Sequence, residues 1–419
     1  MDAQTDSQRD AALRQSLSLR VLAGAPHRLL FFVGAANVLL AMVWWTAWLA
    51  AARWPGLLPS HPSLVPAGWM HAVVMQYQVL PPFMFGFLLT VFPRWLGLEP
   101  LARRHYLPVG LGLFGGQLLT LLGLCGLPMG VPVGLALGFA GWTLALISLL
   151  GCLRREREPN WHARSCAVAL LFGWVGLGLV LAYLFTGNPR LMFAAIKFGG
   201  FALLLPVYFT VNHRMTPFFT GCVFPDYRPW RPMWLLAAFW VGLVVHLSLE
   251  LRHAYAWLWV VDLPMTALTA LTLWRWWPRG QGKPMPGLLR VLYLGFAWLP
   301  VAFALYAAQS AWFAISGEWA FARAPAHALF IGYFGSLLVA MVTRVTQGHA
   351  GRPLELGSTA VFAFAVVQLT VLLRLAAEAG ADALAWQVAA GLAWLLAFVP
   401  WVLHSGGIYL RPRTDGKPG

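Results

Sequence analysis

Charged residues are scarce in this chain of 419 amino acids. Only 10% of the residues are charged and 60% are hydrophobic, whereas a soluble domain carries roughly 25% charged residues. No soluble fold has an interior large enough to hide this much apolar surface, so the composition excludes a soluble globular protein. In lipid, every backbone polar group needs an internal partner, which leaves only helical bundles and closed barrels.

Several sequence signatures are also missing. The four cysteines show no paired spacing, and the chain has neither a Cys-x-x-Cys motif nor a Cys-x-x-Cys-His motif for covalent haem attachment. It has no glycine-rich phosphate-binding loop. Acidic residues are nearly absent from the apolar stretches. Only Asp262 and Lys197 come close to the mid-membrane ionisable group that a proton-coupled transporter usually needs.

Long apolar runs, in contrast, fill the chain. Twelve of them reach the length of about 20 residues that a membrane-spanning helix needs. They are continuous rather than alternating, which favours helices over barrel strands. We therefore predict an all-α polytopic membrane bundle of about 12 transmembrane helices over residues 29–404, with terminal segments at 1–28 and 405–419. The predicted spans are 29–52, 68–92, 106–126, 128–153, 163–186, 190–211, 232–250, 254–277, 286–314, 322–347, 356–378 and 384–404.

The net charge of +15 follows the predicted topology. Of the 29 Lys and Arg residues, 23 fall in the termini and the alternate loops on their side, and four fall in the opposite loops. The positive-inside rule then predicts that both termini are cytoplasmic. Basic charge so distributed is explained by topology and by contact with anionic lipid headgroups, so the lipid bilayer and not a nucleic acid is the expected partner.

The second, sixth and tenth spans end in similar ways. Each is closed at its cytoplasmic end by an arginine, and the three arginines, Arg94, Arg214 and Arg344, follow one another at nearly even intervals along the chain. This spacing predicts three units of four helices, each with its polar residues on its second helix, and repeats of this kind place sites at their interfaces. The alternative is that these arginines only set the topology.

Two histidines lie at the outer ends of repeated spans. His71 is near the start of the second span and His327 near the start of the tenth. Two neutral imidazoles at one depth on different helices can clamp a haem iron from both faces. The small residues Gly332, Gly335 and Ser336 would let another helix or a flat macrocycle approach closely. The pattern thus favours a haem b site at His71 and His327; the alternative is two histidines hydrogen-bonded to neighbouring helices.

A second polar cluster is predicted at the cytoplasmic ends of the same spans. Histidines suit copper, and arginines suit anionic groups such as haem propionates; a solvated rim of snorkelling arginines is the alternative. The cluster contains Arg94, Arg214, Arg344 and Arg352 as cofactor-binding candidates and His213 and His349 as metal ligands, with His27 and Cys222 nearby. The remaining histidines are expected to be solvated in loops (His61, His105, His162) or structural at span ends (His246, His253, His404).

Three segments resemble the NnrS family of bacterial membrane proteins. The first is His71-Ala72 with Met75, followed by the stretch Gly86-Phe-Leu-Leu-Thr-Val-Phe-Pro93. The second is Arg214 with Pro217-Phe-Phe-Thr220. The third joins His327-Ala-Leu329, Thr343-Arg344 and Gly348-His-Ala-Gly-Arg-Pro-Leu354, and is the longest and most specific.

The resemblance implies a bacterial inner-membrane protein that contains haem and copper and is linked to denitrification and nitric oxide resistance. One departure from the family pattern stands out: Val73 and Val74 replace a histidine and a glutamate of its first motif, which puts one metal site in doubt. A looser likeness joins the chain to the catalytic subunit of haem–copper oxidases, which also has twelve spans and haem ligands on spans two and ten. That subunit's His-His pair on span seven is missing, since this chain offers only His246 there.

The expected function is therefore nitric oxide binding or electron transfer at a b-type haem held by His71 and His327. Nitric oxide or another small gas would be the ligand, and a quinol headgroup is one candidate for the inner cluster. Two alternatives stay open. One is a quinol-linked enzyme resembling a nitric oxide reductase, and the other is a twelve-helix transporter without haem.

Overall fold

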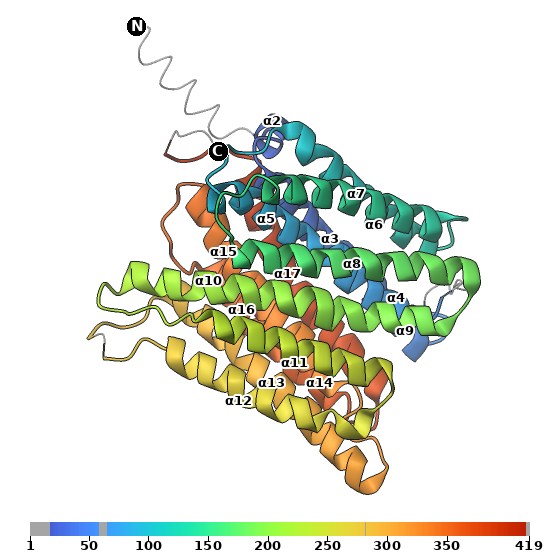
Figure 1. Ribbon diagram of the computed structural model, residues 1–419. Helices are drawn as coiled ribbons and strands as arrows, with labels where there is room; N and C mark the ends of the chain where they lie inside the picture. Colours follow the sequence, from blue (N-terminus) through green and yellow to red (C-terminus); the bar gives the residue numbers. More distant parts are fainter. Residues whose placement is uncertain (1–16, 58–64, 281, 416–419) are drawn as a thin grey trace, which may run out of the picture.

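The computed structural model describes residues 17–57, 65–280 and 282–415, which form a helical bundle and contain no strand (Figure 1). The α-helices are α2 (Leu19–Leu22), α3 (Pro26–Arg53), α4 (Ala67–Val74), α5 (Pro81–Trp95), α6 (Leu107–Leu124), α7 (Gly130–Leu153), α8 (Trp161–Thr186), α9 (Pro189–Lys197), α10 (Leu205–Val223), α11 (Met233–Leu251), α12 (Trp259–Trp276), α13 (Gly287–Ser316), α14 (Ala324–His327), α15 (Ser336–His349), α16 (Ser358–Ala376) and α17 (Ala383–Tyr409). Short 3-10 turns are η2 (Arg103–His105) and η4 (Tyr255–Trp257), and π-helical segments are η1 (Met75–Val79), η3 (Phe198–Leu204) and η5 (Ala328–Gly335).

The predicted all-α membrane bundle is confirmed. Eleven helical segments of the described chain are long and apolar enough to cross a membrane. The eighth predicted span, 254–277, is present as α12, but it is not among the eleven. Its 18 residues include Asp262, Arg275 and several threonines, which lower its mean hydropathy.

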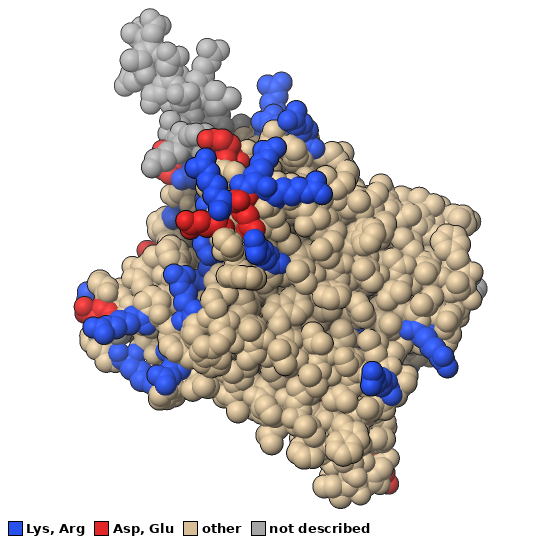
Figure 2. Space-filling view, viewed as in Figure 1, with Lys and Arg blue, Asp and Glu red and all other residues tan. Residues whose placement is uncertain are grey.

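The helices run between two chemically different ends. Lys and Arg gather where the first and last described residues meet, while most of the remaining visible surface is bare of charge (Figures 1 and 2). There the backbone N–H of Ser18 donates to the carbonyl of Leu410 at 2.9 Å. We call this the basic end, and the opposite end, where α4, α9 and α14 begin, the far end.

The sixth predicted span is longer than its apolar run. We predicted that it ends at 211 and that a loop begins at Arg214, but α10 continues to Val223. The predicted boundary is wrong because the polar residues satisfy one another along the helix. Thr216 Oγ1 donates to Asn212 Oδ1 at 3.0 Å and Thr220 Oγ1 donates to the carbonyl of Thr216 at 2.9 Å, so the helix gains hydrogen bonds where the sequence looks polar. Likewise, α17 extends from the predicted end at 404 to Tyr409.

A π-helical segment interrupts three of the spans, and they are the second, sixth and tenth. The spans are α4–η1–α5, α9–η3–α10 and α14–η5–α15, which we call the three second helices because each is the second helix of a predicted unit. π-Helical turns are rare and frequently mark functional sites. Their recurrence at these three places is what three repeated units would give.

Prolines explain the irregularity in the first of these helices. Pro82 has no N–H, so it cannot bond the carbonyl of Gln78 four residues earlier. Asn37 Nδ2 on α3 donates to that carbonyl instead, at 2.8 Å. Tyr77 donates its hydroxyl proton to the carbonyl of Ala195 on α9 at 2.6 Å. The freed backbone groups of one second helix are thus met by neighbouring helices, as lipid requires.

Close packing of glycines holds the hairpin of α6 and α7 together. A Cβ on Gly134 would collide with the backbone of Thr120 and the carbonyl of Gly116, whereas a Cβ on Gly138, one turn further along the same helix, would meet nothing within 4 Å. Small residues at such interfaces allow helices to approach in lipid.

The Gly134→Ala substitution should therefore lower stability by about 1–3 kcal/mol, the usual effect of overpacking. The measurement is thermal unfolding of the purified protein in detergent. Gly138→Ala is the matched control and should leave the midpoint unchanged or raise it, because alanine favours a helix over glycine. Equal losses in both variants would contradict this packing.

Candidate functional sites on the three second helices

At the far end, the first predicted site residue is held by a stack of aromatic rings. The imidazole of His71 on α4 lies over the indole of Trp45 on α3, with ring centroids 4.2 Å apart and planes 12° apart. Trp45 in turn stacks on Trp48 at 5.1 Å. This stack fixes the plane of the His71 ring, which is half-buried.

The second predicted ligand, His327, has its tautomer set by the backbone. Its Nδ1 lies 2.9 Å from the carbonyl of Arg323, one turn earlier. Because a carbonyl only accepts, Nδ1 carries the proton and Nε2 keeps a lone pair. A metal-binding histidine is commonly oriented in this way.

The structure places His71 within electrostatic range of His327, although their helices lie far apart in the sequence. Two arginines, Arg323 and Arg374, lie within electrostatic range of both rings, and Arg374 forms an ion pair with Glu378, two residues beyond the end of α16. Sequence reasoning missed this pair of cations, although an arginine inside a span, as Arg374 is, was itself a signal.

Of the two approaches expected at the small residues of this span, the structure shows that of a helix. Gly332, which could have admitted a flat macrocycle, is covered by the indole of Trp298 on α13, so a neighbouring helix takes the space. The Trp298 indole N–H donates to Gln368 at 2.8 Å, and Gln368 donates to Ser336 at 2.8 Å. The small residues of the tenth span therefore serve helix packing.

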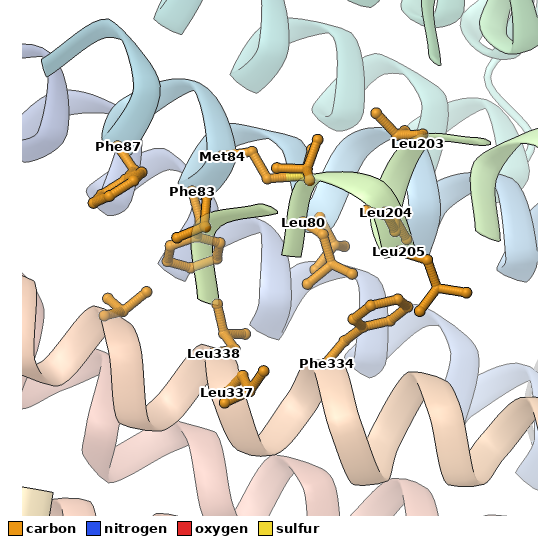
Figure 3. Packing of buried hydrophobic residues seen from close by; sticks show 14 of the residues in the cluster. Leu80, Phe83, Met84, Phe87, Leu203, Leu204, Leu205, Phe334, Leu337 and Leu338 are labelled. Atoms are coloured by element: carbon orange, nitrogen blue, oxygen red, sulfur yellow. The ribbon is translucent and has the colours of Figure 1, made fainter. Parts of the chain in front are cut away.

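Midway along the bundle, the three second helices and Phe31 of α3 line a small, partly open apolar cavity of about 70 Å³. Figure 3 shows Phe83, Met84 and Phe87 of α5 facing Leu337 and Leu338 of α15 around this region. The wall residues include Phe87, Val207 and Leu337, each seven positions before the arginine that closes its helix, and also Leu88, Tyr208 and Leu338, each six positions before it. The cavity thus lies where equivalent faces of the three units meet.

At the basic end, two of the closing arginines contact an aromatic ring of a different unit. The guanidinium of Arg214 lies over the Trp95 ring of the first unit at 4.5 Å, and that of Arg344 over the Phe219 ring of the second at 4.0 Å. Arg94 acts on His349 of the third unit. The two cation–π contacts therefore join the second unit to the first and the third unit to the second, and each adds roughly 0.5–2 kcal/mol.

The predicted metal ligands of the inner cluster are separated into two histidine pairs. His213 lies 2.9 Å from His162 (Nδ1 to Nε2), and its own Nε2 lies 3.2 Å from the carbonyl of Pro232. His349 stacks against His27 with ring centroids 4.2 Å apart. The expectation that His162 is a solvated loop residue is wrong, because it lies in the first turn of α8 and is buried against His213.

Arginines surround the pair of His27 and His349. The positive charges of Arg28, Arg94 and Arg413 lie within electrostatic range of both rings. Arg28 also donates hydrogen bonds to the carbonyls of Tyr409 and Arg411. Arg352, also predicted for the cluster, is half-buried and acts on His404 instead. His61 lies outside the described residues. Among the residues that the structure describes, no three His, Cys, Asp or Glu side chains are grouped as a metal ion would need.

Fold and sites together define a polytopic all-α membrane protein with ionisable side chains at both ends of its three second helices. Comparison with known families gives the assignment. The sequence matches the family described as NnrS protein over residues 21–413, nearly the whole chain, and the protein belongs to that family. No curated protein matches it.

Proposed function

We propose that this protein takes part in nitric oxide metabolism, by nitric oxide binding or by electron transfer, at a b-type haem held by His71 and His327 in the bacterial inner membrane. Membership of the NnrS family supports a membrane protein connected with nitric oxide. The observation that carries the haem proposal is the meeting of these two histidines, from the second and the ninth of the eleven membrane-length segments, at one end of the bundle.

The side chains around the pair fit the chemistry of a haem. His327 presents Nε2 with a free lone pair, and the stack on Trp45 orients His71. The propionates of a haem are anions, and Arg323 and Arg374 supply positive charge beside both rings. A bound haem would supply one-electron chemistry or a site for a diatomic gas, depending on whether both axial positions are filled.

The central cavity has a different role in this proposal. At about 70 Å³ it is far smaller than the roughly 300 Å³ of an ordinary ligand pocket. It can hold a few water-sized molecules, and its walls are mainly apolar, so it suits a small uncharged gas such as nitric oxide more than water. We propose it as a holding site for gas within the bundle.

Two other functions remain open from the sequence. A quinol-linked nitric oxide reductase would need an electron donor site, for which the arginine-rich basic end is the candidate. A transporter without haem would use the same arginines as an anion site. A purified protein without haem would favour the transporter, and consumption of nitric oxide with a quinol donor would favour the reductase.

The haem proposal predicts that His71→Ala and His327→Ala each lose most of the bound haem. The measurement is the reduced-minus-oxidised visible spectrum of protein purified from cells supplied with haem. His404→Ala is the matched control, since His404 is exposed at the basic end. Full haem content in either variant of the pair would show that the replaced histidine is no ligand.

Copper, which the resemblance also implies, is proposed at the pair of His27 and His349. Both ring nitrogens of His213 are already engaged, whereas within the described residues no hydrogen bond engages the His349 ring. Imidazole suits copper. Copper content per protein should therefore fall at least several-fold in His349→Ala and stay unchanged in His213→Ala. Elemental analysis of the purified variants measures this, and the reverse order would move the site to His213.

The proposed orientation places the basic end in the cytoplasm. Cys125 is exposed after α6 at the far end, and Cys222 is exposed in the last turn of α10 at the basic end. With one of these cysteines left in each variant, a membrane-impermeant maleimide added to spheroplasts should label Cys125 and spare Cys222 until the cells are lysed. Labelling of Cys222 alone would invert the orientation.

A further inference from the structure

A buried chain of ionisable groups at the far end lies apart from the two histidines discussed above. Lys197 Nζ on α9 lies 2.9 Å from Glu250 Oε1 on α11, and that oxygen lies 3.7 Å from His246 Nε2. His246 Nδ1 lies 2.7 Å from Asp262 Oδ1 on α12. We call these four residues the far-end chain. Asp262 and Lys197, the two groups that the sequence places nearest to an intramembrane ionisable site, thus belong to one network.

The inner members of the far-end chain are fully enclosed. His246 and Asp262 are 0% exposed and Glu250 is 3% exposed, whereas the Lys197 side chain is 24% exposed. His246 lies five residues before the end of α11, which is a depth of about 7.5 Å along the helix. The chain therefore leads from the far-end surface, at Lys197, into the apolar interior.

Three polar atoms of the chain have no hydrogen-bond partner among the described residues, namely His246 Nε2, Glu250 Oε2 and Asp262 Oδ2. The 3.7 Å between His246 Nε2 and Glu250 Oε1 exceeds hydrogen-bond length. A purely structural ion-pair network would be expected to use these atoms, because unpaired buried polar groups are unfavourable. Because these three atoms have no partner, we infer that the far-end chain exchanges a small species with its surroundings.

The side chains packed around His246 favour a proton as the small species that is exchanged. Phe201 of η3 stacks on His246 with centroids 3.9 Å apart, and the Tyr306 ring meets its edge at 5.4 Å. Tyr306 and Tyr255 are the other titratable groups that the two carboxylates act on. The ammonium group of Lys197 already supplies a positive charge to the far-end chain, so a metal cation is disfavoured there.

We propose that the far-end chain is a proton-loading site that takes up one proton from the water at the far end, on His246 Nε2, and releases it again. With His246 neutral, its Nδ1–H donates to Asp262 and the four side chains sum to a charge of −1. Adding the proton from water at Nε2 gives an imidazolium between two carboxylates and a sum of zero. A low-dielectric site favours the uncharged sum, so the loaded state is the resting one.

The repeat gives independent support for a functional role of Lys197 in the far-end chain. Counted back from the closing arginines Arg214 and Arg344, Lys197 and His327 occupy the same position of their helices, and each stands immediately before a π-helical segment. The position that carries a histidine in the third unit thus carries the lysine of the far-end chain in the second. The inference requires no haem or copper, so it can fail or succeed independently of the proposed function.

The test is a pH titration of the protein labelled with ¹⁵N-histidine and followed by solid-state NMR, with His246→Gln to assign the signal. We expect the His246 signal to change from imidazolium to neutral imidazole as the pH rises. Glu250→Gln removes an anion that favours the imidazolium and should move the midpoint to lower pH by about one unit, a tenfold change in proton affinity. Lys197→Met removes a cation and should move it to higher pH.

Glu318→Gln is the matched control, because Glu318 is an exposed carboxylate at the same end, and its midpoint should equal that of the unmodified protein. A His246 signal that keeps one form over the whole pH range would overturn the proposal and leave a static ion-pair cluster. Midpoints that move in the same direction in Glu250→Gln and Lys197→Met would overturn it as well. Should His246→Gln fail to fold, the opposite shifts in the two other variants identify the signal.

Discussion

An ionisable side chain inside lipid must find its partner within the protein, and this constraint governs the arrangement of the bundle. Such side chains lie at both ends of the three second helices and on the helices packed against them. Two of the closing arginines find such a partner in another unit: Arg214 lies over Trp95 and Arg344 over Phe219. These two contacts join neighbouring units beside the apolar cavity.

The same constraint places the ionisable side chains in two sets, one at each end of the bundle. The basic end combines arginines with two histidine pairs, while the far end presents His71, His327 and the far-end chain. Between the two ends the second helices line the apolar cavity. π-Helical segments mark the change in each helix, and a carbonyl freed in the first of them, that of Gln78, is met by Asn37 of a neighbouring helix. A gas can occupy such a middle region, whereas an ion cannot do so without partners.

The spans could be predicted from the sequence because an apolar run is a local property. The convergence of His71 and His327 could be predicted because the repeat gave their helices equivalent positions. Partners could not be predicted in the same way. His162 looked like a loop residue, yet it pairs with His213, because only the tertiary fold brings α8 beside α10. Arg323 and Arg374 join the far-end site through contacts between α14 and α16 that no periodicity encodes. The extension of α10 was missed because residues such as Thr216 are polar in sequence but bonded within the helix.

The central claim is that two imidazoles, His71 and His327, hold one haem between the second and the tenth spans. Electron paramagnetic resonance of the oxidised protein tests it most directly, because two axial imidazoles make ferric haem six-coordinate and low-spin. We expect a low-spin signal of the bis-histidine type in the unmodified protein, replaced by a high-spin signal in His327→Ala if haem is retained there. An iron that is high-spin in the unmodified protein would contradict the two-histidine clamp.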